Sequence, residues 1–505
     1  MLVRAFSLAL LVVFALLPTW LQDGFDGTEG RRVQIALEMA ANDSWLVPTL
    51  GQEPTWAKPP LHYWLLRLGH AAFGDGMLAL RLPSVLGAWL LAFVAGELLR
   101  RWFGARAGWI GACAIATSPL VLSQWPTAEI DPLFASLTAM SLFCLATGVA
   151  RDRRFLVLAA GALGGLALLQ KGPPYFVFAL GAWLVWWRHR RLRGFVGYFA
   201  AMLAVAACYY VPLWTLVVRP DELLAVANEE SLGRLFTYEW RHVADIPAFW
   251  VRAVAVQMPF VLWCFWEWRG ARDARMDAAD LTLRMCSGAA VVAIALLTLF
   301  PGRSTRYLLP NVPLFTFAVA PAVAQFVTLR GPLPRFASRA VAFVGLAGAT
   351  ALLVLPFVVQ APIAALGFAA ACAVTPWFAT SARGVVGACL LLPLAASWTV
   401  GLERAQDFGV GTRERRFAGT RFRQEMEALG VTPADLRTSG HFDSPLLLAM
   451  RWWLHGDEQA RKPWQSRWVL CEVEPSRALP ADYRERVRLV LPFKSFAVME
   501  RADGK

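Results

Sequence analysis

The chain has 505 residues, of which 57% are hydrophobic and 17% charged, and its mean hydropathy is +0.47. Soluble globular domains carry about 25% charged residues, so these proportions exclude that class and indicate that most of the chain lies in lipid. The formal net charge of +13 is compatible with a nucleic-acid-binding protein, but the positions of the basic residues exclude that function as well.

Long apolar segments recur up to residue 400, whereas residues 401–505 have ordinary polar composition. Because a helix that crosses a bilayer needs about 20 apolar residues, we expect a transmembrane domain over 1–400 with about thirteen helices, followed by a small domain over 401–505. No small-residue cleavage site follows the first apolar segment, which we interpret as an uncleaved span. The expected spans are 4–21, 78–100, 105–124, 131–150, 155–171, 173–188, 195–218, 249–268, 283–300, 308–329, 338–359, 362–380 and 384–400.

Arginines cluster in alternate connections between these spans, for example at 100–106, 151–154 and 188–193. Connections rich in Lys and Arg stay on the cytoplasmic side of a membrane. We therefore expect an inner-membrane protein with a cytoplasmic N-terminus. The connection 22–77 and the C-terminal domain would then be periplasmic. The basic charge is explained by topology, so no nucleic-acid partner is expected.

The sequence lacks the local motifs of metal, redox and nucleotide sites. Seven of the eight cysteines lie in or beside apolar segments, and no CxxC pair, HExxH motif, Walker loop or Rossmann fingerprint is present. We expect no cofactor, and no metal is required, although the acids Asp26, Glu29 and Asp131 could still hold one. A glycine-rich stretch at 161–165 lies inside a span and predicts close helix packing.

The connection 22–77 is predicted to contain two amphipathic helices, at 29–41 and 61–73, which are too short to span and would lie along the membrane surface. Tryptophans between and within them suit the membrane interface. Such a segment can build a cavity at the membrane boundary, where a lipid-linked substrate presents its headgroup.

Several motifs in this part of the chain occur together in a known family. They are EGRRVQIALEM (29–39), DSWLVPTLGQEPTWAKPPLHYWL (43–65), ALRLPSVLGAW (79–89), AEIDPLFA (128–135), LLQKGPPY (168–175), EESLGRL (229–235) and GRSTRYLLPNVP (302–313). In order and spacing over about residues 1–330, the chain resembles the bacterial relatives of protein O-mannosyltransferases, and among these the lipid A 4-amino-4-deoxy-L-arabinose transferases. The resemblance implies an all-α polytopic membrane protein with the C-type glycosyltransferase fold, to which the sequence adds a small C-terminal α/β domain. It also implies a polyprenyl-phosphate sugar donor, and we expect the acceptor to be lipid A, another envelope glycan or a protein.

The resemblance also implies which acids form the site. The family's first-loop Asp-Glu pair corresponds to Thr28 and Glu29, so the usual aspartate is missing. Glu29, or else Asp26, is expected to orient or deprotonate the acceptor, and Asp131 to complete the acidic part. Two structural roles remain open: Glu29 as a carboxylate at a helix N-terminus, and Asp131 as a helix N-cap.

A phosphate leaving group requires nearby positive charge. Lys58, which precedes two prolines, is the first candidate for this role. The other candidates for the donor phosphate are Arg31, Arg234, Arg306 and Tyr307, with Lys171, Glu230 and His242 as further possible site residues. Alternatives are snorkelling for the two lysines, a structural hydrogen bond for His242, and interfacial anchoring for Arg306 and Tyr307.

The expected reaction is one in-line displacement at the anomeric carbon, with inversion. Two alternatives remain: a transporter or flippase of a lipid-linked sugar, which would place ionisable residues at mid-membrane, and a family member that has lost catalysis, as Thr28 could indicate. In the C-terminal domain, helices at 422–429 and 445–454 and strands at 468–473 and 487–498 are predicted. Either acceptor binding or a structural cap would account for that domain.

Overall fold

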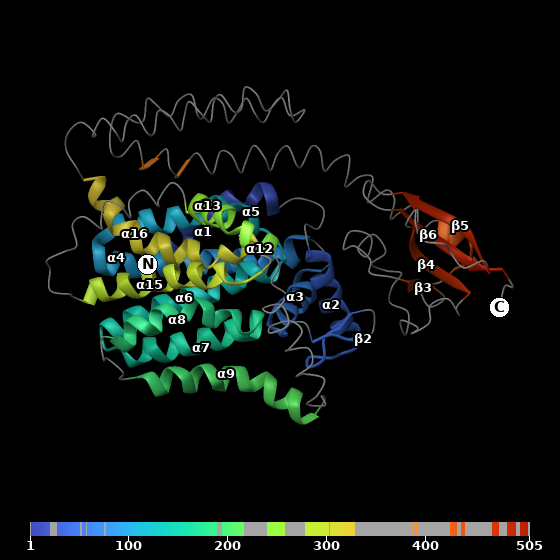
Figure 1. Cartoon of the computed structure of the whole chain (residues 1–505), viewed down its shortest axis with the longest axis horizontal. Helices are drawn as coiled ribbons and strands as arrows, with labels where there is room; N and C mark the ends of the chain where they lie inside the picture. The colour runs from blue at the N-terminus through green and yellow to red at the C-terminus, as the bar shows by residue number, and fades with distance from the viewer. Residues whose placement is uncertain are drawn as a thin grey trace, which may run out of the picture.

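Figure 1 shows the computed structural model of the chain. It describes residues 2–20, 28–50, 53–56, 58–74, 77–188, 194–216, 240–257, 278–301, 303–328, 386–387, 390–391, 425–431, 436–439, 467–473, 482–490 and 495–502. Its helices are α1 (Leu2–Trp20), α2 (Glu29–Ala41), α3 (Leu61–Phe73), α4 (Met77–Ala116), α5 (Pro119–Gln124), α6 (Ile130–Ala150), α7 (Arg154–Lys171), α8 (Pro174–Arg188), α9 (Phe195–Leu216), α12 (Trp240–Ala244), α13 (Ile246–Ala255), α15 (Ala278–Thr298), the 3-10 turn η2 (Thr305–Leu308) and α16 (Asn311–Phe326).

A bundle of apolar helices forms most of the described structure, with α6 at its centre (Figure 1). In the most apolar stretch of α6, 94% of the residues are buried, against 28% for α9, so α9 lies at the periphery of the described bundle. Within the described residues, α4, α6, α7, α9 and α15 are long and apolar enough to cross a membrane. The predicted helical membrane fold is therefore confirmed, whereas the count of thirteen stays a prediction because the spans expected between 338 and 380 lie outside the described residues.

The chain direction reverses at Gly104 within α4, so this element consists of two helical limbs. Gly104 has φ = 87°, a conformation that costs glycine little. The two limbs then pack so closely that a Cβ on Gly96 would lie 3.0 Å from the Gly108 carbonyl oxygen. The predicted pair of spans, 78–100 and 105–124, is thus a helical hairpin, except that its second limb ends at Ala116 and α5 follows.

The two predicted surface helices are present with the predicted bounds, as α2 and α3. They pack against each other and the start of α4 around a small core that contains Val33, Met39, Tyr63, Leu66 and Leu80. The short strands β1 (Thr49–Leu50) and β2 (Glu53–Pro54) pair in the connection between them. This segment forms a compact unit at one end of the bundle (Figure 1).

The C-terminal residues contain a four-stranded sheet of order β3-β4-β6-β5. Its strands are β3 (Leu436–Ser439), β4 (Trp468–Val473), β5 (Tyr483–Val490) and β6 (Ser495–Arg501). The strand predicted at 468–473 is confirmed. The single strand predicted at 487–498 is wrong, because β5 and β6 are two antiparallel strands, and Pro492 between them lacks the N–H that a continuous strand would need. The helix predicted at 445–454 and the boundary at residue 401 lie outside the described residues.

Close approach of α7 and α9 confirms the packing predicted for 161–165. A Cβ on Gly165 would lie 2.6 Å from the carbonyl oxygen of Met202, and one on Gly161 would overlap that of Tyr198. Two helix backbones meet there, so neither obstacle can rotate away.

We expect Gly161→Ala to lower the free energy of unfolding by about 1–3 kcal/mol through overpacking, measured as a lower melting temperature in detergent. Gly197→Ala at the same interface is the matched control. Its Cβ would meet only the end of the flexible Leu158 side chain, at 3.1 Å, and little change is expected. Equal melting temperatures for the two variants would contradict this account of the interface.

Candidate functional site

Three buried carboxylates, Glu29, Glu129 and Asp131, lie where α2, the loop before α6, and the end of α7 converge. Glu29 begins α2, Glu129 immediately precedes α6, and Asp131 lies in its first turn. Burying a carboxylate is costly unless partners replace its hydration. The partners of these three acids differ, and they indicate what each acid can do.

Glu29 is fully enclosed, with 0% of its surface exposed. Arg81 of α4 donates two hydrogen bonds to it, from Nε to Oε1 at 3.1 Å and from a terminal nitrogen to Oε2 at 3.0 Å. The backbone N–H of Ala128 also donates to Oε1. This bidentate pair therefore fastens α2 to α4 and to the loop before α6.

Glu129 has a different environment. The backbone N–H and the hydroxyl of Thr28 donate to its Oε1 at 2.6 and 2.9 Å, and the hydroxyl lies 2.7 Å from Oε2. Among the described residues it forms no ion pair. Burial raises the pKa of Glu129, and the hydrogen bonds from Thr28 oppose that rise only in part.

Asp131 lies among cations. Lys171 at the end of α7 donates to its Oδ1, and Arg306 Nε of η2 lies 3.7 Å from its Oδ2. Lys171 Nζ also lies 4.9 Å from the centre of the Tyr307 ring. The group of Asp131, Lys171 and Arg306 carries one more positive than negative charge, and 41% of the Arg306 side chain is exposed.

Lys58 is half-buried in the segment that enters α3. The next residue, Pro59, packs beside the chain at Gly172, where a Cβ would lie 3.8 Å from Pro59 Cγ. Because Gly172 directly follows Lys171, the Lys58 segment runs alongside the cationic end of α7.

A neutral histidine braces this region from within. Gln170 Nε2 donates to His62 Nδ1 at 3.1 Å and to the Ile130 carbonyl at 3.1 Å. His62 Nε2 then donates to the Ala128 carbonyl at 2.6 Å. Burial lowers the pKa of His62 to about 4, so the uncharged tautomer fixes α3 against the loop that carries Glu129 and Asp131.

The structure brings together some of the predicted site residues and separates others. Asp131, Lys171, Arg306 and Tyr307 form one group, and Thr28 joins it through Glu129. Arg31 is exposed, because it lies about 200° around α2 from Glu29. The His242 carbonyl accepts a hydrogen bond from Arg303. Asp26, Glu230 and Arg234 lie outside the described residues.

Sequence reasoning missed Glu129, Arg81, His62 and Gln170. All four stand inside motifs that carry the family resemblance. A charged residue such as Arg81 in an otherwise apolar span signals a buried partner, and this signal was available from the sequence.

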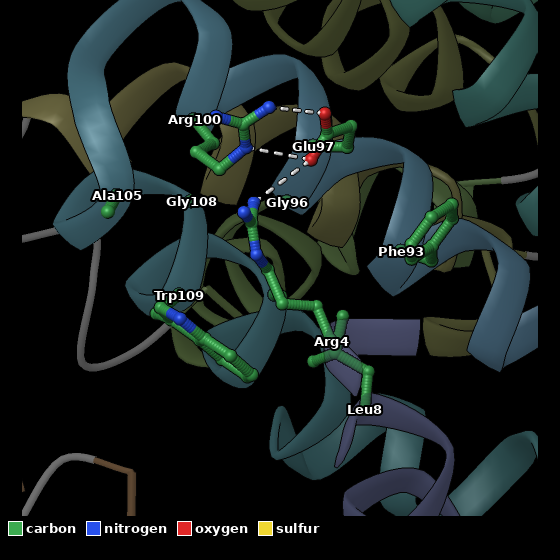
Figure 2. A pocket seen from close by; sticks show the side chains of 10 residues that line it. Arg4, Leu8, Phe93, Gly96, Glu97, Arg100, Ala105, Gly108 and Trp109 are labelled. Atoms are coloured by element: carbon green, nitrogen blue, oxygen red, sulfur yellow. Dashed lines mark hydrogen bonds and ion pairs between the residues drawn. The ribbon is translucent and has the colours of Figure 1, made fainter. Parts of the chain in front are cut away.

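A second charged cluster lies at the far end of α4. Arg81 and Arg100 are nineteen residues apart on one limb, about 28 Å at 1.5 Å per residue, close to the thickness of a bilayer core. There Glu97 accepts from Arg100 at 2.6 and 2.8 Å, from Arg101 at 3.0 Å and from Arg4 at 3.5 Å. Arg4, Glu97 and Arg100 line the pocket in Figure 2, which is therefore remote from the three carboxylates.

No group of three His, Cys, Asp or Glu side chains suited to a metal ion occurs among the described residues. Each of the three carboxylates accepts hydrogen bonds from protein donors. That the site works without a metal stays a prediction.

Comparison with known proteins connects this geometry to a family. Residues 57–214 match the dolichyl-phosphate-mannose-protein mannosyltransferase family. An undecaprenyl phosphate-alpha-4-amino-4-deoxy-L-arabinose arabinosyl transferase of Pseudomonas savastanoi pv. phaseolicola is 26% identical over 345 residues, which cover 64% of this chain and 61% of that protein. Its counterpart from Pseudomonas aeruginosa LESB58 is 30% identical over 230 residues, 44% of this chain and 40% of that protein. The chain thus matches less than two thirds of the length of these relatives.

Solved structures show the same fold. Crystal structures of ArnT from Cupriavidus metallidurans are similar to this chain, with a TM-score of 0.74 for the form bound to undecaprenyl phosphate and 0.69 for the apo form. The former is 19% identical and covers 99% of this chain and 97% of its own. At this identity the likeness concerns the fold.

We expect Arg81→Met to lower the free energy of unfolding by about 3–5 kcal/mol, because it leaves the Glu29 carboxylate buried without its cation. The double variant Glu29→Gln/Arg81→Met should be less destabilised than the sum of the two single variants. Melting temperatures of all three in detergent would measure the coupling.

The matched control is Arg101→Met, which removes an ion pair whose arginine side chain is 54% exposed and should cost less than about 1 kcal/mol. Strict additivity of the Glu29 and Arg81 variants would show that the pair does not fasten α2 to α4.

Proposed function

Because the chain belongs to the superfamily of membrane glycosyltransferases with the C-type fold that includes the protein O-mannosyltransferases and the lipid A 4-amino-4-deoxy-L-arabinose transferases, we propose that it transfers a sugar from a polyprenyl-phosphate donor. The acceptor would be a cell-envelope molecule such as lipid A, another glycan or a protein.

The cationic group around Asp131 is the observation that carries this proposal. Arg306 Nε is buried and donates no hydrogen bond to a described residue, while its distance of 3.7 Å from Asp131 leaves it able to bond to an anion. A lipid phosphate that leaves the sugar gains negative charge, and preorganised cations stabilise such charge in the transition state. Lys171 and Arg306 would bind this phosphate, with Asp131 holding both side chains in place.

Lys58 is proposed as a further phosphate ligand, since its segment runs beside Lys171. We propose that Arg31 and Arg234 contact the donor phosphate in the complex with the donor. Tyr307 would line the site. For Glu230 and His242 we propose contacts around the donor. Of the acids predicted in the first connection, Glu29 is enclosed by its bonds to Arg81, so we propose Asp26 as the acid of this connection that orients the acceptor.

We further propose an inner-membrane location with about thirteen spans. The Arg4–Glu97–Arg100 cluster would lie at the cytoplasmic face and the three carboxylates at the periplasmic face. The two charged regions on α4 are separated by about the thickness of a bilayer core. The region around Glu97 holds Arg4, Arg100 and Arg101, and such an excess of arginine is typical of the cytoplasmic side. The sheet of the C-terminal domain would then be periplasmic.

Enzyme purified in detergent, supplied with a panel of polyprenyl-phosphate sugars that begins with undecaprenyl phosphate-4-amino-4-deoxy-L-arabinose, tests the function. Release of free polyprenyl phosphate is measured with and without a membrane-lipid extract. We expect acceptor-dependent release, reduced about 10²-fold or more by Lys58→Ala because a transition-state charge contact is lost.

Arg101→Ala, at the opposite end of α4, is the matched control and should retain the wild-type rate. Donor binding without release across the whole panel would favour a carrier of lipid-linked sugar or a catalytically inactive member. Equal losses in the Lys58 and Arg101 variants would remove the assignment of Lys58.

A further inference from the structure

The three buried carboxylates of the site are unequal in their freedom to accept a proton. Glu29 has both oxygens bonded to Arg81, a third bond from the Ala128 N–H, and no exposed surface. A carboxylate enclosed in this way cannot contact an acceptor without breaking the link between α2 and α4. Its geometry suits a structural tie.

Asp131 is about as buried as Glu129 but interacts with two cations. Lys171 donates to its Oδ1 and Arg306 Nε lies 3.7 Å from its Oδ2, so both carboxylate oxygens face cations. Its contacts suit the task of orienting Lys171 and Arg306.

Glu129 is neither fully enclosed like Glu29 nor paired with cations like Asp131. It keeps 8% of its surface exposed, it is hydrogen-bonded by the neutral donors of Thr28, and it forms no ion pair within the described residues. Although Glu129 occupies the N-cap position of α6, its side chain makes no capping hydrogen bond, so helix formation does not explain it. It stands two residues from Asp131, beside the proposed phosphate site.

We propose that Glu129 is the catalytic base of this protein and that Thr28 is its positioning residue. This inference rests on the proposed transferase function. In the step, an acceptor oxygen attacks the anomeric carbon, the bond from that carbon to the phosphate oxygen breaks with its electron pair, and the acceptor O–H proton passes to a Glu129 carboxylate oxygen. Polyprenyl phosphate leaves, held by Lys171 and Arg306.

The arrangement accounts for Thr28, which occupies the position of the first acid in the family's Asp-Glu pair. Thr28 contributes two donors to the Glu129 carboxylate, from its N–H and its hydroxyl. An aspartate in its place would set a second negative charge against Glu129. The carboxylate is thus carried by the loop before α6, and the first connection supplies the hydrogen bonds that aim it.

The charged groups around Glu129 set its pH response. Arg32 of α2 and Arg306 of η2 favour its ionised form, whereas Asp131 and burial oppose it, and burial is the largest effect. Since the pKa of Glu129 is raised and the base must be ionised, kcat/KM should fall as the pH decreases through that raised pKa.

The test compares wild type, Glu129→Gln, Glu129→Asp and Thr28→Val in the release assay, with undecaprenyl phosphate binding measured on each. Glu129→Gln should lower kcat by about 10²–10⁴-fold, the usual contribution of a general base, and should bind undecaprenyl phosphate within about threefold of wild type. Glu129→Asp should retain part of the rate. Thr28→Val should lower kcat less than Glu129→Gln and displace the acidic limb of the pH profile.

Glu38→Gln is the matched control, because Glu38 is also a buried glutamate, about two and a half turns along α2 from Glu29, with Oε1 bonded to Gln34 at 2.7 Å. It should leave the rate unchanged. A wild-type rate in Glu129→Gln, or equal loss of transfer and of undecaprenyl phosphate binding, would overturn the assignment while the transferase function stands. No release by the wild-type protein would instead overturn the proposed function itself.

Discussion

The buried ion pair between Glu29 and Arg81 is the constraint on which the rest of the site depends. It joins the first residue of α2 to a membrane helix, and the same carboxylate accepts from the N–H of Ala128. Breaking it would expose two charges to an apolar interior, which costs several kcal/mol. Thr28 precedes Glu29, and Glu129 follows Ala128. The hydrogen bond between Glu29 and Ala128 therefore holds Thr28 close to Glu129.

The three carboxylates of the site differ in their surroundings, and these surroundings determine the role of each. Each carboxylate has the same chemistry in water, and its partners here make it different: a guanidinium encloses Glu29, two cations surround Asp131, and an alcohol and an amide serve Glu129. A glycosyl transfer needs one group that receives a proton and others that stabilise a departing phosphate. The observed separation of neutral and cationic partners matches those two needs.

Hydropathy was sufficient to predict the helical membrane fold, and local amphipathic patterns predicted α2 and α3 with their observed bounds. The motifs predicted Asp131 and Arg306 as site residues and Lys171 as a possible one, and the three side chains lie beside one another in the structure. What the sequence could not supply was the pairing of Thr28 with Glu129, 101 residues apart, because such contacts follow from helix packing rather than local pattern. The same limit concealed the role of Arg81, whose partner lies 52 residues away.

A cryo-EM structure in lipid nanodiscs with bound undecaprenyl phosphate tests the location of the site most directly. The account predicts the phosphate within about 4 Å of the cationic groups of Lys171 and Arg306, with Glu129 on the side from which an acceptor approaches. Density for the phosphate at the opposite end of α4, beside Arg4 and Arg100 in the pocket of Figure 2, would contradict it.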